Sequence, residues 1–235
     1  DVDIQIRGQR SVDLNKDLRL RAFIFQLNLP HVRVLAQALH DLFGGIRQLL
    51  VTAARDGEGK APARATDAKA VGLEDEGAHA GLNGAYLMRG SEHCDNTTMI
   101  EHLAPHTTCR EIFKGVLDDQ SRAVFQGRII VRKEAQGTDG HQLCKTLLLS
   151  TGAEIDVKPE LEIYADDVAC SHGSTSGAID EDMLFYLRAR GVDKGTAMDL
   201  LVIAFVAEAI EEIEDESFRE EITERLESWL LRRRG

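Results

Sequence analysis

Short apolar segments separated by polar and glycine-rich positions fill the middle of the chain, from residue 74 to residue 179. The stretch Glu160-Leu161-Glu162-Ile163 alternates strictly between charged and apolar residues. Such alternation is typical of β-strands, and sustained helical spacing is missing from this region. We therefore predict an all-β unit over residues 74–179. The pattern by itself fits a sandwich, a barrel and a parallel β-helix equally well.

Residues 180–235 change to helical periodicity and predict a small C-terminal α-helical domain. Asp180 and Asp193 are suited to cap two successive helices, the first of which would stop at Gly191. Ser217 opens a capping-box sequence for a third helix. The apolar positions of the second helix extend beyond one stripe, so we expect it to be buried on more than one side.

Residues 1–73 show neither the strand pattern nor the helical periodicity clearly. They carry a charge of +3 within a chain of net charge −12. A strand is predicted at Phe23–Leu29 and a helix at Val32–Leu50, whereas residues 55–70 have the composition of a loop. Two interpretations of this irregular N-terminal segment stay open. It is either a divergent but folded part of the domain or the product of a shifted reading frame upstream of Glu74.

The overall composition argues against several classes of partner. A net charge of −12 disfavours non-specific binding to nucleic acid or to anionic membranes. No apolar run approaches the roughly 20 residues that a membrane helix needs. The four cysteines form no CxxC pair and no signal-peptide pattern is visible, which favours reduced thiols in a cytoplasmic protein.

Cys170 and His172 are the most interesting candidate site. Residues two apart on an extended strand share a face, with Cα atoms roughly 6.5–7 Å apart. A thiolate and an imidazole at that spacing suit a soft metal or a cluster iron. Two ligands make an incomplete site, and on residue types alone a buried cysteine beside a hydrogen-bonded histidine at a strand end is the more common arrangement.

A second group of soft ligands lies upstream, and its spacing matches no standard zinc module. Pro105 argues against a helix that would present these side chains on one face. In a solenoid, polar side chains one coil apart stack as a matter of course, so metal binding is the less favoured interpretation. The group consists of His93, Cys94, His102, His106 and Cys109.

Catalytic patterns are weak. Adjacent residues Asp166 and Asp167 would point to opposite faces of a strand, which favours a turn over an acid/base pair. Hydroxyl side chains surround His172, but no G-x-S-x-G elbow accompanies them. No Walker A sequence is present, so any nucleotide chemistry would come from a partner.

Several ordered blocks of sequence stand out within about residues 74–213. The longest is Lys158–Gly177, which opens with KPELEIYADDV, and it is followed by Asp180–Gly191. Further blocks lie upstream at Phe113–Leu117, Val124–Arg128 and Gln136–Gly140. Together these blocks resemble the SufB/SufD family of iron–sulfur cluster assembly proteins, and the opening of the longest block is closer to the SufD branch than to the SufB branch.

The resemblance implies a right-handed parallel β-helix followed by a C-terminal helical domain. It implies a non-catalytic scaffold that pairs with a SufB-like subunit through the β-helix and docks a SufC-like ATPase on residues 180–231. A homodimer is the alternative when SufB is absent. Cys170 and His172 would be a metal half-site at the subunit interface, holding an iron–sulfur cluster transiently with the partner and none stably alone.

A β-helix enzyme acting on carbohydrate is the alternative function. Such enzymes need paired carboxylates and usually aromatic side chains for sugar stacking. The chain offers no obvious carboxylate pair, and only 5% of its residues are aromatic.

Overall fold

The computed structural model describes residues 19–27, 46–49, 64–210 and 216–234. This part of the chain contains ten strands followed by three helices. The strands are β1 Arg19–Leu27, β2 Ile46–Leu49, β3 Arg64–Leu73, β4 His79–Met88, β5 His93–His102, β6 Thr108–Leu117, β7 Arg122–Val131, β8 Thr138–Leu148, β9 Glu154–Ile163 and β10 Val168–Gly177. The helices are α1 Glu181–Ala189, α2 Lys194–Ile210 and α3 Glu216–Arg234.

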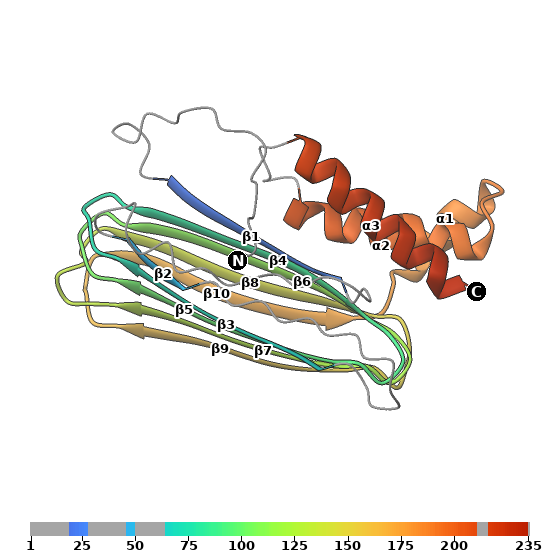
Figure 1. Cartoon of the computed structure of the whole chain (residues 1–235), viewed down its shortest axis with the longest axis horizontal. Coiled ribbons are helices and arrows are strands. Elements are labelled where there is room, and N and C mark those ends of the chain that lie inside the picture. Colours follow the sequence, from blue (N-terminus) through green and yellow to red (C-terminus); the bar gives the residue numbers. More distant parts are fainter. Residues whose placement is uncertain (1–18, 28–45, 50–63, 211–215, 235) are drawn as a thin grey trace, which may run out of the picture.

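The strands form two sheets between which the chain alternates from β3 to β10. Sheet A has the order β1-β4-β6-β8-β10 and sheet B the order β2-β3-β5-β7-β9. All neighbouring strands are parallel except β2, which runs antiparallel to β3. Each coil therefore contributes one strand to each sheet, and the coils stack as a parallel β-helix (Figure 1). The predicted mainly β fold, with its C-terminal helices, is confirmed.

The first coils repeat every 29 residues, because Arg64, His93 and Arg122 occupy equivalent register positions, and the next equivalent position, Glu154, follows after 32 residues. In β5, side chains alternate between buried and partly buried, as the period-two pattern predicts. The buried positions of both sheets fill the space between them. For example, the rings of Phe113 and Phe125 face each other with centroids 4.8 Å apart.

The regular coils of the β-helix begin with β3, ten residues before the boundary expected at residue 74. β3 pairs with β5 in the same register as the later coils, although part of it was expected to be loop. The strand expected at Phe23–Leu29 corresponds to β1. Residues 46–49 of the expected helix form β2, and residues 32–45 lie outside the described part of the chain.

The three C-terminal helices begin close to the expected residues. The Asp180 carboxylate accepts hydrogen bonds from the backbone N–H groups of Asp182 and Met183, at 2.9 and 3.1 Å. The Asp193 carboxylate caps α2 by accepting from the Thr196 N–H at 3.0 Å. α3 begins one residue before the expected Ser217. None of the described helices combines the length and apolar character needed to cross a membrane.

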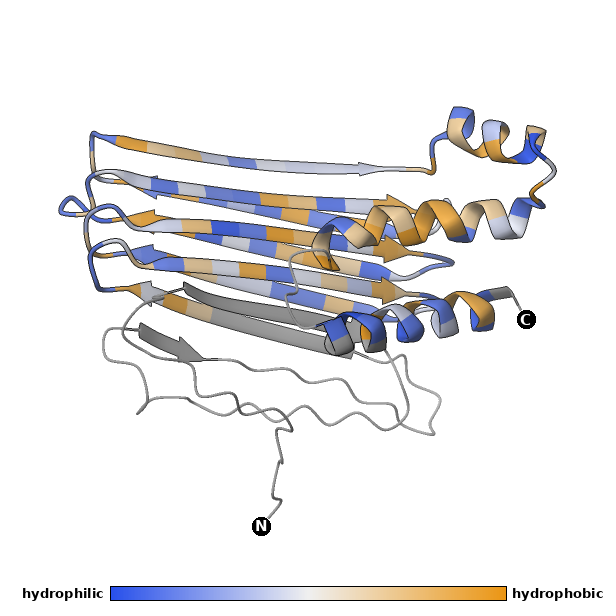
Figure 2. Cartoon of the chain, turned by 90° about the horizontal axis from the view of Figure 1, so that it is seen from above, coloured by the Kyte–Doolittle hydropathy of each residue, from blue (hydrophilic) through white to orange (hydrophobic). Residues whose placement is uncertain are grey.

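α2 and α3 pack against the outer face of sheet A, whereas α1 extends beyond the end of β10 (Figures 1 and 2). The apolar contact joins Val116 of β6 to Val202 and Val206 of α2 and to Trp229 of α3. Every residue of β4 after His79 is buried, and its outward-facing Ala85 and Leu87 belong to the same apolar cluster as α2 and α3. The helical domain and the β-helix thus share one core.

Charged pairs reinforce the docking of the helices. Lys114 of β6 points outward into the contact and bonds the Glu208 carboxylate of α2. Arg233 near the end of α3 pairs with Asp118 just after β6. Both pairs link the helical domain to the strand at the centre of sheet A.

Candidate functional site

The last coil of the β-helix has open edges. β9 and β10 are the end strands of their sheets, each with a single neighbouring strand. In Figure 2, β10 lies at the limit of the stack and leads directly into α1. Unpaired backbone N–H and C=O groups on such strands are a template for pairing with another chain. Natural β-helices usually cover an edge of this kind.

Cys170 and His172 lie on this terminal coil and share its inner face. Cys170 is in register with Gly140, and His172 is in register with Gln142. Gln142 is buried in the coil interior, where its amide donates to the Glu111 carboxylate at 2.5 Å. The sequence expectation that Cys170 and His172 face the same way therefore agrees with the register.

The two side chains differ in their exposure. His172 is exposed because no further coil lies over it, while Cys170 is partly buried, with its sulfur 3.5 Å from the point where a Gly140 Cβ would lie. Burial raises the pKa of the Cys170 thiol, so the free side chain is protonated at neutral pH. Metal coordination would have to displace that proton.

The pair remains an incomplete metal site in this chain. Among the residues that the structure describes, no three histidine, cysteine or acidic side chains are placed to hold one metal ion. A metal ion held by Cys170 and His172 would therefore need further ligands from outside the described residues.

The upstream group of histidines and cysteines is brought together only in part. His102 Nε2 lies 3.3 Å from Cys109 Sγ inside the coil. His106 is instead an exposed turn residue with φ of 56°. Cys94 is buried and accepts from the Asn96 side-chain amide at 3.2 Å.

The His102–Cys109 contact is that of two neutral core groups. Burial lowers the pKa of His102 to about 4 and raises the pKa of Cys109 to about 12. Thr107 donates to the Ala104 carbonyl at 3.1 Å, so its oxygen accepts from His102 Nδ1–H at 2.7 Å. His102 Nε2 then accepts from the thiol, and both ring nitrogens are satisfied within the protein.

The candidates for acid/base and nucleophilic catalysis separate in space. Asp166 and Asp167 lie in the turn between β9 and β10, as expected from the sequence. Ser171 does not pair with His172 but bonds His141 of β8 on the outer face of the sheet, at 2.5 Å. His141 was missed in the sequence analysis. The alternation Asp139-Gly140-His141, which puts two polar side chains on one face, was the available signal.

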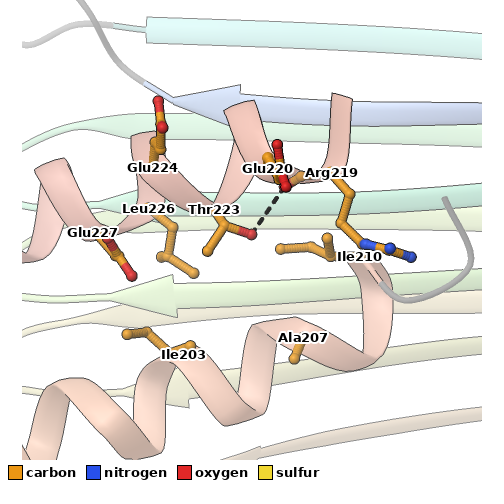
Figure 3. A pocket seen from close by; sticks show the side chains of 9 residues that line it. All are labelled: Ile203, Ala207, Ile210, Arg219, Glu220, Thr223, Glu224, Leu226 and Glu227. Carbon is orange, nitrogen blue, oxygen red and sulfur yellow. Dashed lines mark hydrogen bonds between the residues drawn. The ribbon is translucent and has the colours of Figure 1, made fainter. Parts of the chain in front are cut away.

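A groove of about 440 Å³ lies between α2 and α3 (Figure 3). Its floor is apolar, formed mainly by Ile203, Ile210 and Leu226. Three carboxylates from α3, at positions 220, 224 and 227, stand along its rim in Figure 3, together with the single guanidinium of Arg219. An apolar floor beneath an acidic rim fits an amphipathic segment with basic flanking residues.

Comparison with known proteins places these features in a family. The family model for the SUF system FeS cluster assembly, SufBD core domain, matches residues 64–205. The iron–sulfur cluster assembly protein SufD of Escherichia coli is 40% identical over 154 residues, which is 66% of this chain and 36% of that protein. The SufBD family protein slr0076 of Synechocystis is 39% identical over 127 residues, covering 54% of this chain and 28% of the relative.

Protein ABCI7, chloroplastic, of Arabidopsis thaliana is 40% identical over 118 residues, which is 50% of this chain and 25% of that protein. The chain thus spans about a third or less of the length of these relatives. The match to the family model begins where β3 begins and ends within α2, so it includes the β-helix and the terminal coil. This chain belongs to the SufB/SufD family of iron–sulfur cluster assembly proteins, on its SufD-like side.

Proposed function

We propose that this chain is a non-catalytic scaffold of a SufBCD-type complex, in which the terminal coil pairs with a SufB-like subunit and the helical domain docks a SufC-like ATPase. The observation that supports this most directly is the half-site of Cys170 and His172 on a coil with open strand edges. A partner that adds strands to β9 and β10 would also bring the missing ligands. A second copy of the chain would take that place when SufB is absent.

The cluster in this proposal is cargo that the two subunits hold together and then release. His172 provides an imidazole that no hydrogen bond in the described structure occupies, and Cys170 provides a thiol that metal binding would deprotonate. Ligands of mixed imidazole and thiolate type suit cluster iron. A half-site of two ligands favours release, because neither subunit retains the cluster alone.

Substitution His172→Ala tests this role. We expect it to lower the rate of cluster formation, followed by visible absorbance in a complex reconstituted with SufB-like and SufC-like subunits, by roughly tenfold or more. The exposed position of His172 means that folding and complex assembly should be unchanged. Ser174→Ala, two residues along the same face, is the matched control. An unaltered rate in the His172→Ala complex would remove this residue from the mechanism.

The groove between α2 and α3 is the proposed docking surface for the ATPase. Ala207→Arg would fill the groove with a long side chain, and we expect it to weaken capture of the purified ATPase by roughly tenfold to a hundredfold. Ala204→Arg, at an exposed position of the same helix outside the groove, should leave capture unchanged. Equal binding by both variants would show that the ATPase docks elsewhere. Point substitutions are preferable to truncation because the helices share a core with sheet A.

A further inference from the structure

Four polar side chains form a continuous chain of hydrogen bonds across the outer face of sheet A. Arg110 of β6 binds the Asp139 carboxylate of β8 with both terminal nitrogens, at 3.0 and 3.2 Å. The same carboxylate also contacts His141, whose Nε2 lies 2.7 Å from Asp139 Oδ1. His141 Nδ1 in turn lies 2.5 Å from the Ser171 hydroxyl of β10. These hydrogen bonds therefore connect three neighbouring strands of sheet A, β6, β8 and the terminal strand β10.

The charges of these four side chains determine which group donates and which accepts in each hydrogen bond. The two hydrogen bonds from Arg110 hold the pKa of Asp139 below its ordinary value, so the carboxylate is ionised and acts only as an acceptor. In the neutral imidazole, Asp139 therefore fixes the proton on Nε2 of His141. Nδ1 is then left as an acceptor, and Ser171 donates its hydroxyl proton to it.

Ser171 lies between the two residues of the proposed half-site. Because side chains alternate along a strand, Ser171 points to the outer face while Cys170 and His172 point to the inner one. β10 has only β8 as a neighbour, and within the described structure no other side chain of β10 is hydrogen bonded to a side chain. The contact with His141 thus adds a hydrogen bond between side chains to the restraints on β10 that come from its pairing with β8 and from the hydrogen bond of the Cys170 sulfur to the Gly140 backbone.

A serine, a histidine and an aspartate in sequence also resemble a hydrolytic triad. Here, however, the His141 and Asp139 side chains are 39% and 42% exposed on an open sheet face. The stabilisation of a developing oxyanion by preorganised donors is strongest in a site that is shielded from bulk solvent. The exposure favours a mechanical role over a chemical one.

We propose that Ser171 and His141 are positioning residues, which hold β10 from the outer face and so orient Cys170 and His172 for cluster assembly. The inference rests on the proposed function of that pair. Ligands at a metal or cluster site need support from surrounding hydrogen bonds, and misplacement by about 1 Å can cost a hundredfold in rate. An edge strand with one neighbour has the greatest need of such support.

One test does not depend on cluster chemistry. Cys170 is the one cysteine of the four that is not buried, so the rate of alkylation by iodoacetamide in the unmodified chain reports on β10. We expect Ser171→Ala and His141→Ala to raise the alkylation rate of Cys170 several-fold, and Ser171→Thr, which keeps the hydroxyl, to restore it. Ser174→Ala is the control that should have no effect. Unchanged alkylation in Ser171→Ala and His141→Ala would overturn the inference even if His172 proves essential.

A double-mutant cycle in the reconstituted complex tests whether Ser171 acts through His172. Ser171→Ala should slow cluster formation by roughly tenfold in the wild-type background and have little effect in the His172→Ala background. The same factor in both backgrounds would mean that Ser171 supports the fold in general and does not position the ligand. If His172→Ala is itself harmless, the proposed function fails, while the alkylation result still decides whether the outer contact holds the strand.

Discussion

Substitution Gly115→Val is expected to lower the free energy of unfolding by about 3 kcal/mol, because it places a branched side chain where the ring of Tyr86 already lies. A Cβ at position 115 would be 2.4 Å from two ring carbons of Tyr86. Tyr86 is buried in the coil interior, and its hydroxyl reaches across Gly115 of the next coil to Thr146 of the coil after that, at 3.3 Å. The ring has no free space into which to move, so the substitution should also break that hydrogen bond.

Urea denaturation measures the effect as a shift in the transition midpoint at constant slope. Gly177→Val is the matched control, because a Cβ at position 177 meets nothing within 4 Å. Its free energy of unfolding should stay within about 0.5 kcal/mol of that of the unmodified chain. If the two valine variants were equally stable, Tyr86 would not be packed over Gly115 as described. Should Gly115→Val fail to fold, Gly115→Ala gives the same comparison with a smaller side chain.

The kind of most elements from residue 74 onward was predictable, whereas upstream the expected helix contains β2 and the expected loop overlaps β3. The way the strands are arranged was not predictable from the pattern. Period-two alternation at Glu160–Ile163 identified strands, and the capping residues Asp180 and Asp193 identified where helices start. Alternation reports only that one face of a strand is buried, so it cannot distinguish a sandwich from stacked coils. In β4 even the alternation is lost, and part of its outer face packs against α2 and α3. The β-helix was predicted from family resemblance.

The half-site and its support were not equally visible in the sequence. Cys170 and His172 are separated by one residue, so their common face follows from strand geometry alone. The partnership of Ser171 with His141 spans 30 residues, and it depends on the length of the turns that set the coil register. Within a coil, the approach of His102 to Cys109 likewise depends on the turn at His106, which adopts a left-handed conformation. No periodic pattern encodes these long-range contacts.

Lys114 is the clearest case of a residue whose role the sequence concealed. It lies in Phe113–Leu117, a block that was noted only for its family resemblance, and a lysine there would ordinarily face water. Its side chain is instead 2% exposed beneath α2, 4.4 Å from the centre of the Phe205 ring. Its charge is balanced mainly by Glu208, which also lies 3.4 Å from the more exposed Lys145. Removing the carboxylate that neutralises a buried ammonium is costly.

Substitution Glu208→Gln is therefore expected to lower the free energy of unfolding by about 2 kcal/mol, since it leaves the Lys114 ammonium buried without a counter-charge. Lys145→Ala removes a partner of the same carboxylate from a partly exposed position and should cost no more than about 0.5 kcal/mol. The double variant Lys114→Met with Glu208→Leu should recover most of the loss, because no charge then remains to be desolvated. A Glu208→Gln chain as stable as Lys145→Ala in urea denaturation would contradict this account.

The same pair has an expected pH dependence. The hydrogen bond from Lys114 and then its charge lower the pKa of Glu208 from its ordinary value of 4.5. A carboxylate whose pKa is lower in the folded than in the unfolded state stabilises the fold above its unfolded-state pKa, and this contribution is lost as the pH falls through the folded-state value. The difference in unfolding free energy between the unmodified chain and Glu208→Gln should thus be constant near neutral pH and shrink on acidification below about pH 4.5. A difference that grew on acidification would show that Glu208 is not held in its ionised form by Lys114.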